Sequence, residues 1–353
     1  MPYMNFEFAN NYYLYFLAYM VVPALFFFKA KVTRTLDIDS SMSKSSTDQL
    51  RGLFIVIMVI HHISQRMANP VLLTPFNDMG YYAVGIFFFL SGFGLTKSFT
   101  RKNTYLDKFF TKKIVKIYIP FVIVNTLTII AIRMKGDDLS VLEILGYSLS
   151  IKMIDTTQWF IVAILIFYVF FWLSFITTAN IVKSQISITV LVFLFIISCK
   201  YLSLGGWWYI SSLCFPMGVI YAANEKKLFE IIYNKYNFVI ALSLVLFILT
   251  LVLFLKSIFP AMGLISCVFF TLFIIVISFK ILPCSKLFSM IGIISMEIYM
   301  IHMKVLALFI YFLPFDSSLI IIPYFISLII LSVYFNKLNN FIFNRLLRVK
   351  TAG

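Results

Sequence analysis

Long apolar runs separated by short polar segments extend over the whole chain. Eleven of them approach the roughly 17–25 residues that a helix needs to cross a bilayer. They occupy residues 12–30, 50–67, 80–98, 114–133, 157–178, 185–201, 207–223, 236–255, 258–279, 287–313 and 318–335. The runs lack the strict alternation of barrel strands, and lipid leaves an open sheet edge without hydrogen-bond partners. The pattern therefore predicts an all-α fold, a polytopic integral membrane helix bundle with about 11 transmembrane helices.

The composition favours the same class of protein. Hydrophobic residues make up 62% of the 353 residues and charged residues only 12%, whereas soluble domains average roughly 45–50% and 25%. Basic loops beside a membrane explain the net charge of +15 better than nucleic acid does, because no soluble segment could hold a duplex. The four cysteines are scattered and show no CxxC spacing, so neither a disulfide framework nor a metal site is expected.

The distribution of basic residues predicts an orientation. Placing the segment between the third and fourth runs inside puts 22 of the 29 Lys and Arg residues on the cytoplasmic side. The N-terminus is then outside and the C-terminus cytoplasmic. The first run lacks the basic start of a cleaved signal, so we expect a retained span. The predicted regions are a span and cytoplasmic loop at 1–49, a transmembrane core at 50–335 and a short basic cytoplasmic tail at 336–353.

Ionisable groups inside the runs are the first functional candidates, because a charge at mid-bilayer costs about 2.5 kcal/mol or more. Arg51 and His62 of "RGLFIVIMVIHH" would lie within about 20° of each other on a helix, and about 16 Å apart along it. Arg51 would bind an anion at the cytoplasmic mouth and His62 would handle a proton. His61 points roughly 80° away from Arg51 and is the weaker candidate. Alternatively, Arg51 snorkels and the histidines bond neighbouring helices.

The tenth run carries a second set of polar positions. They are Ser295, Tyr299 and His302 on one helical stripe, and Glu297 and Lys304 on a nearly opposite stripe. A straight helix cannot direct both stripes into one cavity, so either protein surrounds it or Gly292 permits a distortion. Interhelical hydrogen bonding is the alternative role for the hydroxyl groups.

The segment before the fourth run is the densest basic stretch. It would either bind a phosphorylated cytosolic donor or only hold its side of the membrane against lipid headgroups. Its candidate residues are Arg101, Lys108, Lys112, Lys113 and Lys116.

Five segments, taken in order, resemble the membrane-bound acyltransferase 3 family of polysaccharide and peptidoglycan O-acyltransferases. They are "LRGLFIVIMVIHH" at 50–62, "GIFFFLSGFGL" at 85–95, "KFFTKKIVKIYIP" at 108–120, "QWFIVAILIFY" at 158–168 and "ISMEIYMIHM" at 294–303. Each is unspecific alone, but their order across residues 51–303 is a strong signal. Two departures are visible. The family core commonly has ten spans, so either the run at 12–30 is an addition or the count of eleven is off by one, and the basic stretch has lysines where arginines are frequent.

The resemblance implies an integral-membrane O-acyltransferase in a cell membrane of the bacterial inner (plasma) type. Its donor would be cytosolic acyl-CoA, most simply acetyl-CoA, acting as a co-substrate with no permanently bound cofactor. The acceptor would be a hydroxyl of a cell-surface or lipid-linked carbohydrate. The chain shows none of the extracytoplasmic hydrolase-like domain fused to some members. Transfer to the acceptor would then occur either at the helix bundle itself or with a separate extracytoplasmic transferase as a further partner, beside membrane lipid.

The resemblance also implies roles for residues. His62 would be the general base or a transient acyl carrier, and the basic stretch would bind the CoA phosphates. The implied catalytic set is His62, Arg51, Glu297, Tyr299 and His302. The implied substrate or oxyanion candidates are His61, Ser91, Gln158, Trp159 and Ser295.

Two other classes of function compete with this one. Buried His and Glu would also suit a proton-coupled transporter or flippase for a lipid-linked sugar or organic anion. No two-fold repeat or pair of broken helices is visible in the sequence, which counts against transport. A structural or sensory membrane protein would leave the five ordered motifs unexplained.

Overall fold

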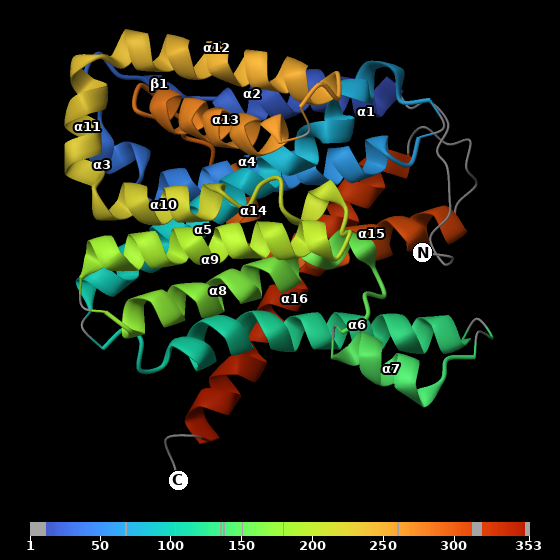
Figure 1. Cartoon of the computed structure of the whole chain (residues 1–353). Coiled ribbons are helices and arrows are strands. Elements are labelled where there is room, and N and C mark those ends of the chain that lie inside the picture. The colour runs from blue at the N-terminus through green and yellow to red at the C-terminus, as the bar shows by residue number, and fades with distance from the viewer. Residues whose placement is uncertain are drawn as a thin grey trace.

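The computed structural model describes residues 12–67, 69–102, 104–134, 136, 138–149, 151–178, 180–259, 261–312 and 320–349. Over these residues the protein is an all-helical bundle with one two-stranded ladder (Figure 1). Its elements are α1 (Tyr12–Phe16), η2 (Leu17–Val21), α2 (Val22–Phe27), β1 (Lys31–Val32), α3 (Ile38–Ser41), α4 (Lys44–Ser64), η3 (Val71–Asp78), α5 (Met79–Arg101), η4 (Phe110–Val115), α6 (Lys116–Met134), α7 (Val141–Ser148), η5 (Thr156–Gln158), α8 (Trp159–Ile176), α9 (Ile181–Tyr201), η6 (Gly206–Trp208), α10 (Cys214–Ala223), α11 (Glu225–Asn234), α12 (Tyr236–Leu255), α13 (Met262–Ser278), β2 (Ile281–Leu282), α14 (Lys286–Ile293), α15 (Ser295–Phe312) and α16 (Ile321–Val349).

The predicted membrane class is confirmed by the lengths and composition of these helices. Seven helical stretches in the described part of the chain are long and apolar enough to cross a membrane, and three shorter apolar helices accompany them. The spanning stretches are Val71–Arg101, Phe110–Met134, Thr156–Ile176, Ile181–Tyr201, Tyr236–Leu255, Ser295–Phe312 and Ile321–Leu346. The total of about eleven spans and the orientation stay predictions. Residue 313 of the tenth predicted run, residues 318–319 of the eleventh, and residues 1–11 and 350–353 of the terminal regions lie outside the described residues.

Two predicted runs differ internally from a continuous helix. In the run at 207–223, only α10 is α-helical, and the preceding residues form η6 and turns. In the run at 287–313, a turn at Ile294 separates α14 from α15. Both runs are apolar enough to be predicted as spans. Their composition does not indicate where the helix is interrupted.

α12 shows how the membrane environment inverts the usual distribution of polar residues. Its buried side chains are Ser243 and Thr250, whose hydroxyls donate to carbonyls of the preceding turn. The large apolar side chains, such as Val245 and Leu249, are exposed. A helix of a soluble protein would bury the apolar face. The outer surface of α12 is therefore a lipid-facing surface.

α4 lies at the centre of the bundle and packs on α5, α14 and α15. Two glycines let α14 cross it at close range. A Cβ atom on Gly52 would lie 1.9 Å from the Phe288 carbonyl oxygen, and one on Gly292 would lie 1.7 Å from the Asp48 carbonyl oxygen. Only hydrogen fits at both positions, so α14 can cross α4 this closely only because both residues are glycines.

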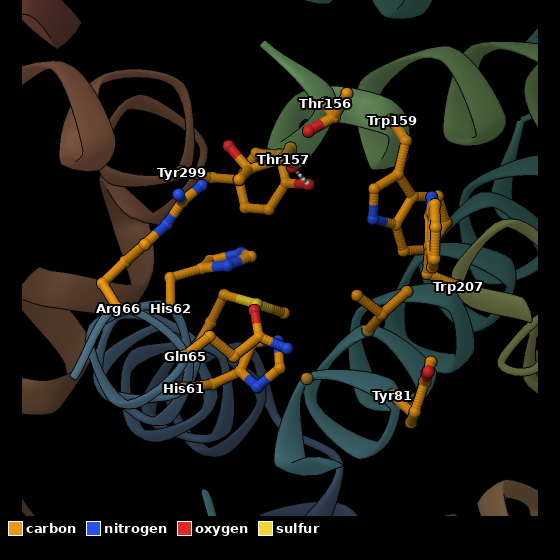
Figure 2. Close-up of a pocket in the computed structure, with 13 residues that line it drawn as sticks. His61, His62, Gln65, Arg66, Tyr81, Thr156, Thr157, Trp159, Trp207 and Tyr299 are labelled. Atoms are coloured by element: carbon orange, nitrogen blue, oxygen red, sulfur yellow. Dashed lines mark hydrogen bonds between the residues drawn. The ribbon is translucent and has the colours of Figure 1, made fainter. Parts of the chain in front are cut away.

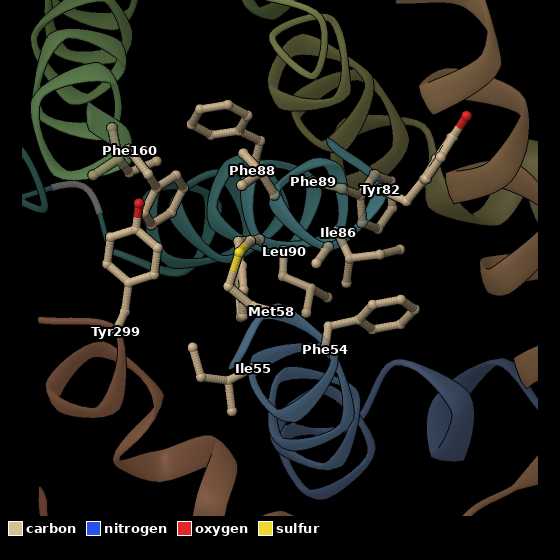
Figure 3. Close-up of a cluster of buried hydrophobic side chains, with 14 of the residues drawn as sticks. Phe54, Ile55, Met58, Tyr82, Ile86, Phe88, Phe89, Leu90, Phe160 and Tyr299 are labelled. Carbon is tan, nitrogen blue, oxygen red and sulfur yellow. The ribbon is translucent and has the colours of Figure 1, made fainter. Parts of the chain in front are cut away.

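The core beside α4 is built from large apolar side chains (Figure 3). Phe54, Ile55 and Met58 of α4 meet Ile86 and Leu90 of α5 and are almost fully buried. Such packing holds α4 and α5 rigidly against each other, because each buried apolar side chain contributes about 1.5–3 kcal/mol. The polar end of α4 is thereby presented from a fixed support.

The N-terminal helical segment α1–η2–α2 is fastened to the rest of the bundle at both ends. At one end, the Tyr19 hydroxyl donates to the Leu72 carbonyl oxygen at 2.5 Å. At the other, β1 pairs antiparallel with β2, with Lys31 opposite Leu282. Between them, the rings of Phe26 and Phe288 meet edge to face at 5.2 Å. The segment is therefore an integral part of the fold.

Candidate functional site

A cavity of about 240 Å³ lies at the C-terminal end of α4 (Figure 2). α4, the start of α5, η5 with the start of α8, η6 and α15 contribute its walls. Of the predicted site residues, it brings together His61, His62, Trp159 and Tyr299. It also contains residues that the sequence did not single out, namely Gln65, Arg66, Tyr81, Thr156, Thr157 and Trp207. Aromatic rings and hydrogen-bonding groups thus surround His62.

His62 is buried between two other imidazoles. Its ring stacks on that of His302 with centroids 5.1 Å apart, and lies 4.7 Å from that of His61. The Gln65 side chain is within hydrogen-bonding reach of His62. His302 does not itself line the cavity but closes it behind His62. The three histidines of the chain therefore form one cluster.

The angular separation of His61 and His62 does not remove His61 from the site. Consecutive residues are about 100° apart on a helix, yet both line the cavity because it extends around the end of α4. His61 thus points away from Arg51 on the helix and still lines the same cavity as His62, and its rank as the weaker candidate stays a prediction. What distinguishes the two rings is hydrogen bonding, since His61 Nδ1 lies 2.9 Å from the Phe76 carbonyl oxygen.

The backbone contacts assign a tautomer to two of the histidines. His302 Nδ1 lies 2.8 Å from the Tyr299 carbonyl oxygen, just as His61 Nδ1 contacts that of Phe76. A carbonyl oxygen only accepts, so Nδ1 carries the proton in each ring, and Nε2 of the neutral ring offers a lone pair. His302 Nε2 is buried and has no hydrogen-bond partner among the residues that the structure describes.

Tyr299 and Gln158 join α15 to the segment that enters α8. The Tyr299 hydroxyl donates to the Thr157 carbonyl oxygen, and Gln158 Nε2 donates to the Met300 carbonyl oxygen at 2.8 Å. The Tyr299 ring also packs edge to face on that of Phe160, at 5.2 Å. Gln158 is buried in this contact and does not line the cavity. Tyr299 thus lines the cavity with its hydroxyl already committed.

A buried ion pair lies behind the same wall. Lys304 Nζ donates to Asp155 Oδ2, and the Asp155 side chain is only 1% exposed. Asp155 Oδ1 accepts from the Thr157 backbone N–H at 2.9 Å and from its hydroxyl at 2.6 Å. Burial raises the pKa of the Asp155 carboxyl, but Lys304 and Thr157 outweigh this effect and lower it. Asp155 lies in a polar segment between two predicted runs, whereas the first functional candidates were ionisable groups inside the runs.

Glu297, on the other predicted stripe of α15, faces a different helix. Glu297 Oε1 accepts from Asn336 Nδ2 at 2.9 Å and from Asn339 Nδ2 at 3.2 Å, both on α16. Ser295 is half-buried at the first position of α15. Neither residue lines the cavity. Glu297 therefore serves the contact with α16, whereas Lys304 of the same predicted stripe pairs with Asp155 behind the cavity wall.

The remaining predicted residues lie near the N-terminal end of α4. Arg51 is 31% exposed and forms an ion pair with Asp48 at 2.7 Å. The Tyr168 hydroxyl lies beside Ser91 and within electrostatic range of Arg51. Lys113 is half-buried and also close enough to Arg51 to repel it. By helix geometry, Arg51 is about 16 Å from His62 along α4.

The rest of the basic stretch is exposed. Arg101, Lys108, Lys112 and Lys116 all reach solvent, and Lys116 also lies over the Phe343 ring. The predicted site residues thus separate into two groups at opposite ends of α4. In the described part of the chain, no cluster of His, Cys, Asp and Glu could hold a metal ion.

Comparison with known proteins assigns the chain to a family. A family model described as an acyltransferase domain, that of acyltransferase family 3, matches residues 44–337. No curated protein and no solved structure matches significantly. The matched range includes both ends of α4, the basic stretch and α15, and it begins after α1–η2–α2. The chain therefore belongs to the acyltransferase 3 family of membrane acyltransferases.

Proposed function

We propose that the protein transfers an acyl group, acetyl in the simplest case, from acyl-CoA to a hydroxyl of a carbohydrate or lipid-linked glycan. His62 acts as the general base. The observation that carries the proposal is the position of His62, buried between two imidazoles in an aromatic-walled cavity of an acyltransferase-family chain. Aromatic side chains such as Trp159 and Trp207 offer flat apolar faces with polar edges, which suits a sugar ring.

The reaction balances with a single base. The acceptor hydroxyl gives its proton to a ring nitrogen of His62 while the hydroxyl oxygen attacks the thioester carbonyl carbon. A C–O bond forms, the C–S bond breaks, and the leaving thiolate of CoA takes the proton from the imidazolium. The tautomers of His61 and His302 are compatible with a basic His62, because each ring gives its Nδ1 proton to a backbone carbonyl oxygen and not to His62.

Negative charge develops on the carbonyl oxygen during this attack and requires a donor. The Tyr299 hydroxyl is committed to Thr157, so Tyr299 contributes to the shape of the cavity. Arg66 and Gln65 line the cavity on the same side as His62, and Figure 2 shows the Arg66 guanidinium directed toward Tyr299. We assign the stabilisation of the developing charge to Arg66.

The donor phosphates belong at the other end of α4. Arg51 and Lys113 provide two positive charges close together at the predicted cytoplasmic mouth, and charged hydrogen bonds to phosphate are roughly twice as strong as neutral ones. The exposed residues of the basic stretch would add attraction over a longer range. The acyl group is then delivered along α4 toward His62.

The test uses purified protein in lipid nanodiscs with acetyl-labelled CoA and hydroxyl-bearing glycan acceptors. The proposal expects release of free CoA thiol and an alkali-labile ester on the acceptor in equal amounts. Label retained on the protein in a single turnover would replace the general-base role of His62 by an acyl-carrier role. Absence of both thiol release and ester with every acceptor would contradict the proposal.

A further inference from the structure

Three successive contacts fasten the segment entering α8 to α15. Asp155 pairs with Lys304, the Thr157 carbonyl oxygen accepts from Tyr299, and Gln158 donates to the Met300 carbonyl oxygen. The donors and acceptors on α15 span positions 299–304, more than one helical turn. The segment therefore cannot shift along α15 or rotate without losing several bonds together.

This segment forms the wall of the cavity opposite His62. Figure 2 shows Thr156, Thr157 and Trp159 across the cavity from His61 and Gln65. The wall is short, and the first of its three anchors is the carboxylate of Asp155, which also holds the backbone and hydroxyl of Thr157. The position of the wall relative to His62 thus depends on Asp155.

Stability alone is a poor reason for this ion pair. Burying two charges costs free energy that their attraction often fails to repay, and apolar replacements of buried pairs are frequently neutral or stabilising. Asp155 is 1% and Lys304 only 16% exposed. A role in geometry explains the pair better, because charged hydrogen bonds fix both distance and direction.

We propose that Asp155 and Lys304 are positioning residues for the acceptor side of the acyl-transfer site. They hold the Thr156–Trp159 wall at a set distance from His62 and so determine which acceptor hydroxyl reaches the base. The effect on turnover rests on the proposed function, whereas the fastening of the wall does not. Donor phosphates are assigned about 16 Å away along α4, so the pair should act on acceptor binding and leave donor binding alone.

The test compares a double variant with a matched control. D155A/K304M removes both charges together, so neither charge is left buried without its partner, and it also removes the carboxylate that accepts from Thr157. E143Q/K152M removes the neighbouring ion pair, which is exposed and 3.2 Å long. We expect D155A/K304M to raise KM for the acceptor at least about tenfold and to change KM for acyl-CoA by less than about twofold. The control should change neither constant.

A second readout does not require activity. Ile154 is buried next to Asp155, so a thiol introduced by Ile154→Cys in a Cys284→Ser background reports whether the segment detaches. We expect maleimide to label it about tenfold faster in D155A/K304M than in the parent or in E143Q/K152M, because local opening exposes buried groups.

The outcomes separate the two proposals. Unchanged acceptor KM together with unchanged labelling would overturn the positioning role. If no variant, including the parent, transfers acyl groups, the proposed function fails and labelling alone decides: faster labelling supports the positioning role and an unchanged rate overturns it. If D155A/K304M does not fold, T157V removes one bond to Asp155. It should raise acceptor KM about threefold, with T157S restoring it, and an unchanged KM would overturn the proposal.

Discussion

The ionisable side chains at the two ends of α4 differ in exposure and in their partners. At the N-terminal end, Arg51 is 31% exposed and is paired with Asp48 one turn earlier. At the C-terminal end, His61 and His62 are buried against other rings. His61 contacts the Phe76 carbonyl oxygen, and His62 contacts the Gln65 side-chain amide. A phosphate arrives hydrated and is attracted by charges that reach solvent, whereas hydroxyl attack on a thioester gains from exclusion of water. Under the proposed function, the exposed end binds the donor and the buried end carries out the chemistry.

The largest expected effect comes from removing the base. His62→Ala should lower kcat/KM by about a thousandfold, within the range of positioned general bases, because no other imidazole has the same place. The measurement is ester formation from acetyl-CoA in nanodiscs. His61→Ala is the matched control on the same helix end and should cost about tenfold. Equal losses in the two variants would contradict the separate assignment of the two rings.

The opposite end of α4 should respond through KM. Arg51→Ala should raise KM for acyl-CoA about thirtyfold with little change in kcat, since one charged contact to phosphate is lost in ground and transition states alike. Initial rates over a donor titration provide the measurement. Asp48→Asn, which removes the ion pair but keeps the arginine, should leave KM within about twofold. A fall in kcat alone for Arg51→Ala would place the guanidinium at the chemistry instead.

A steric probe can disturb the buried end without removing a functional group. A Cβ atom on Gly80 would lie 2.3 Å from His61 Nε2, whereas Gly94 on the same helix has open space. Gly80→Ala should therefore displace the His61 ring and lower kcat/KM about tenfold. Gly94→Ala should have no effect on the same assay. Full activity of Gly80→Ala would show that the His61 position is immaterial to turnover.

Two adjacent lysines sharpen the comparison at the exposed end. Lys113 is half-buried near Arg51, and Lys112 is exposed. Lys113→Ala should raise KM for acyl-CoA about fivefold, and Lys112→Ala less than about twofold, because exposed charges are screened. Competition with desulfo-CoA, measured by calorimetry, would give the same order in Kd. The reverse order would place the phosphates outside the mouth.

Glu297 should have the smallest effect on turnover. It accepts two amide bonds from α16, away from the cavity. Glu297→Ala should lower the free energy of unfolding by about 1–3 kcal/mol and leave kcat per folded protein within about twofold. Thermal inactivation and active-site titration separate the two quantities, and Glu297→Gln should retain most of the stability. A large loss of kcat in folded Glu297→Ala would support the catalytic role that the resemblance implies for Glu297.

The helices and the two groups on α4 could be predicted from sequence, because both depend on local periodicity. Arg51 and His62 are fixed relative to each other by helix geometry alone. A distortion near Gly292 was one of two alternatives from the sequence, but its place at Ile294 and the close approach of Gly292 to the Asp48 carbonyl, far away in sequence, are seen only in the structure.

Which residues meet in the walls of the cavity could not be predicted from the sequence either. Asp155 and Lys304 are separated by 149 positions. The residues next to each of them in the sequence do not indicate that the two charges form an ion pair. His61 ranked as the weaker candidate on the geometry of one helix alone, whereas its contacts with Phe76 and Gly80 come from the next elements. Long-range pairing is the information that a single periodic pattern lacks.

The ladder between β1 and β2 has a consequence for biosynthesis. About 250 residues separate its two strands along the chain, and ribosomes add roughly 5–20 residues per second. Lys31 and Val32 therefore emerge tens of seconds before Ile281 and Leu282 exist. The contact of Tyr19 with Leu72 can form early, whereas the end held by the ladder can dock only after most of the core has been synthesised.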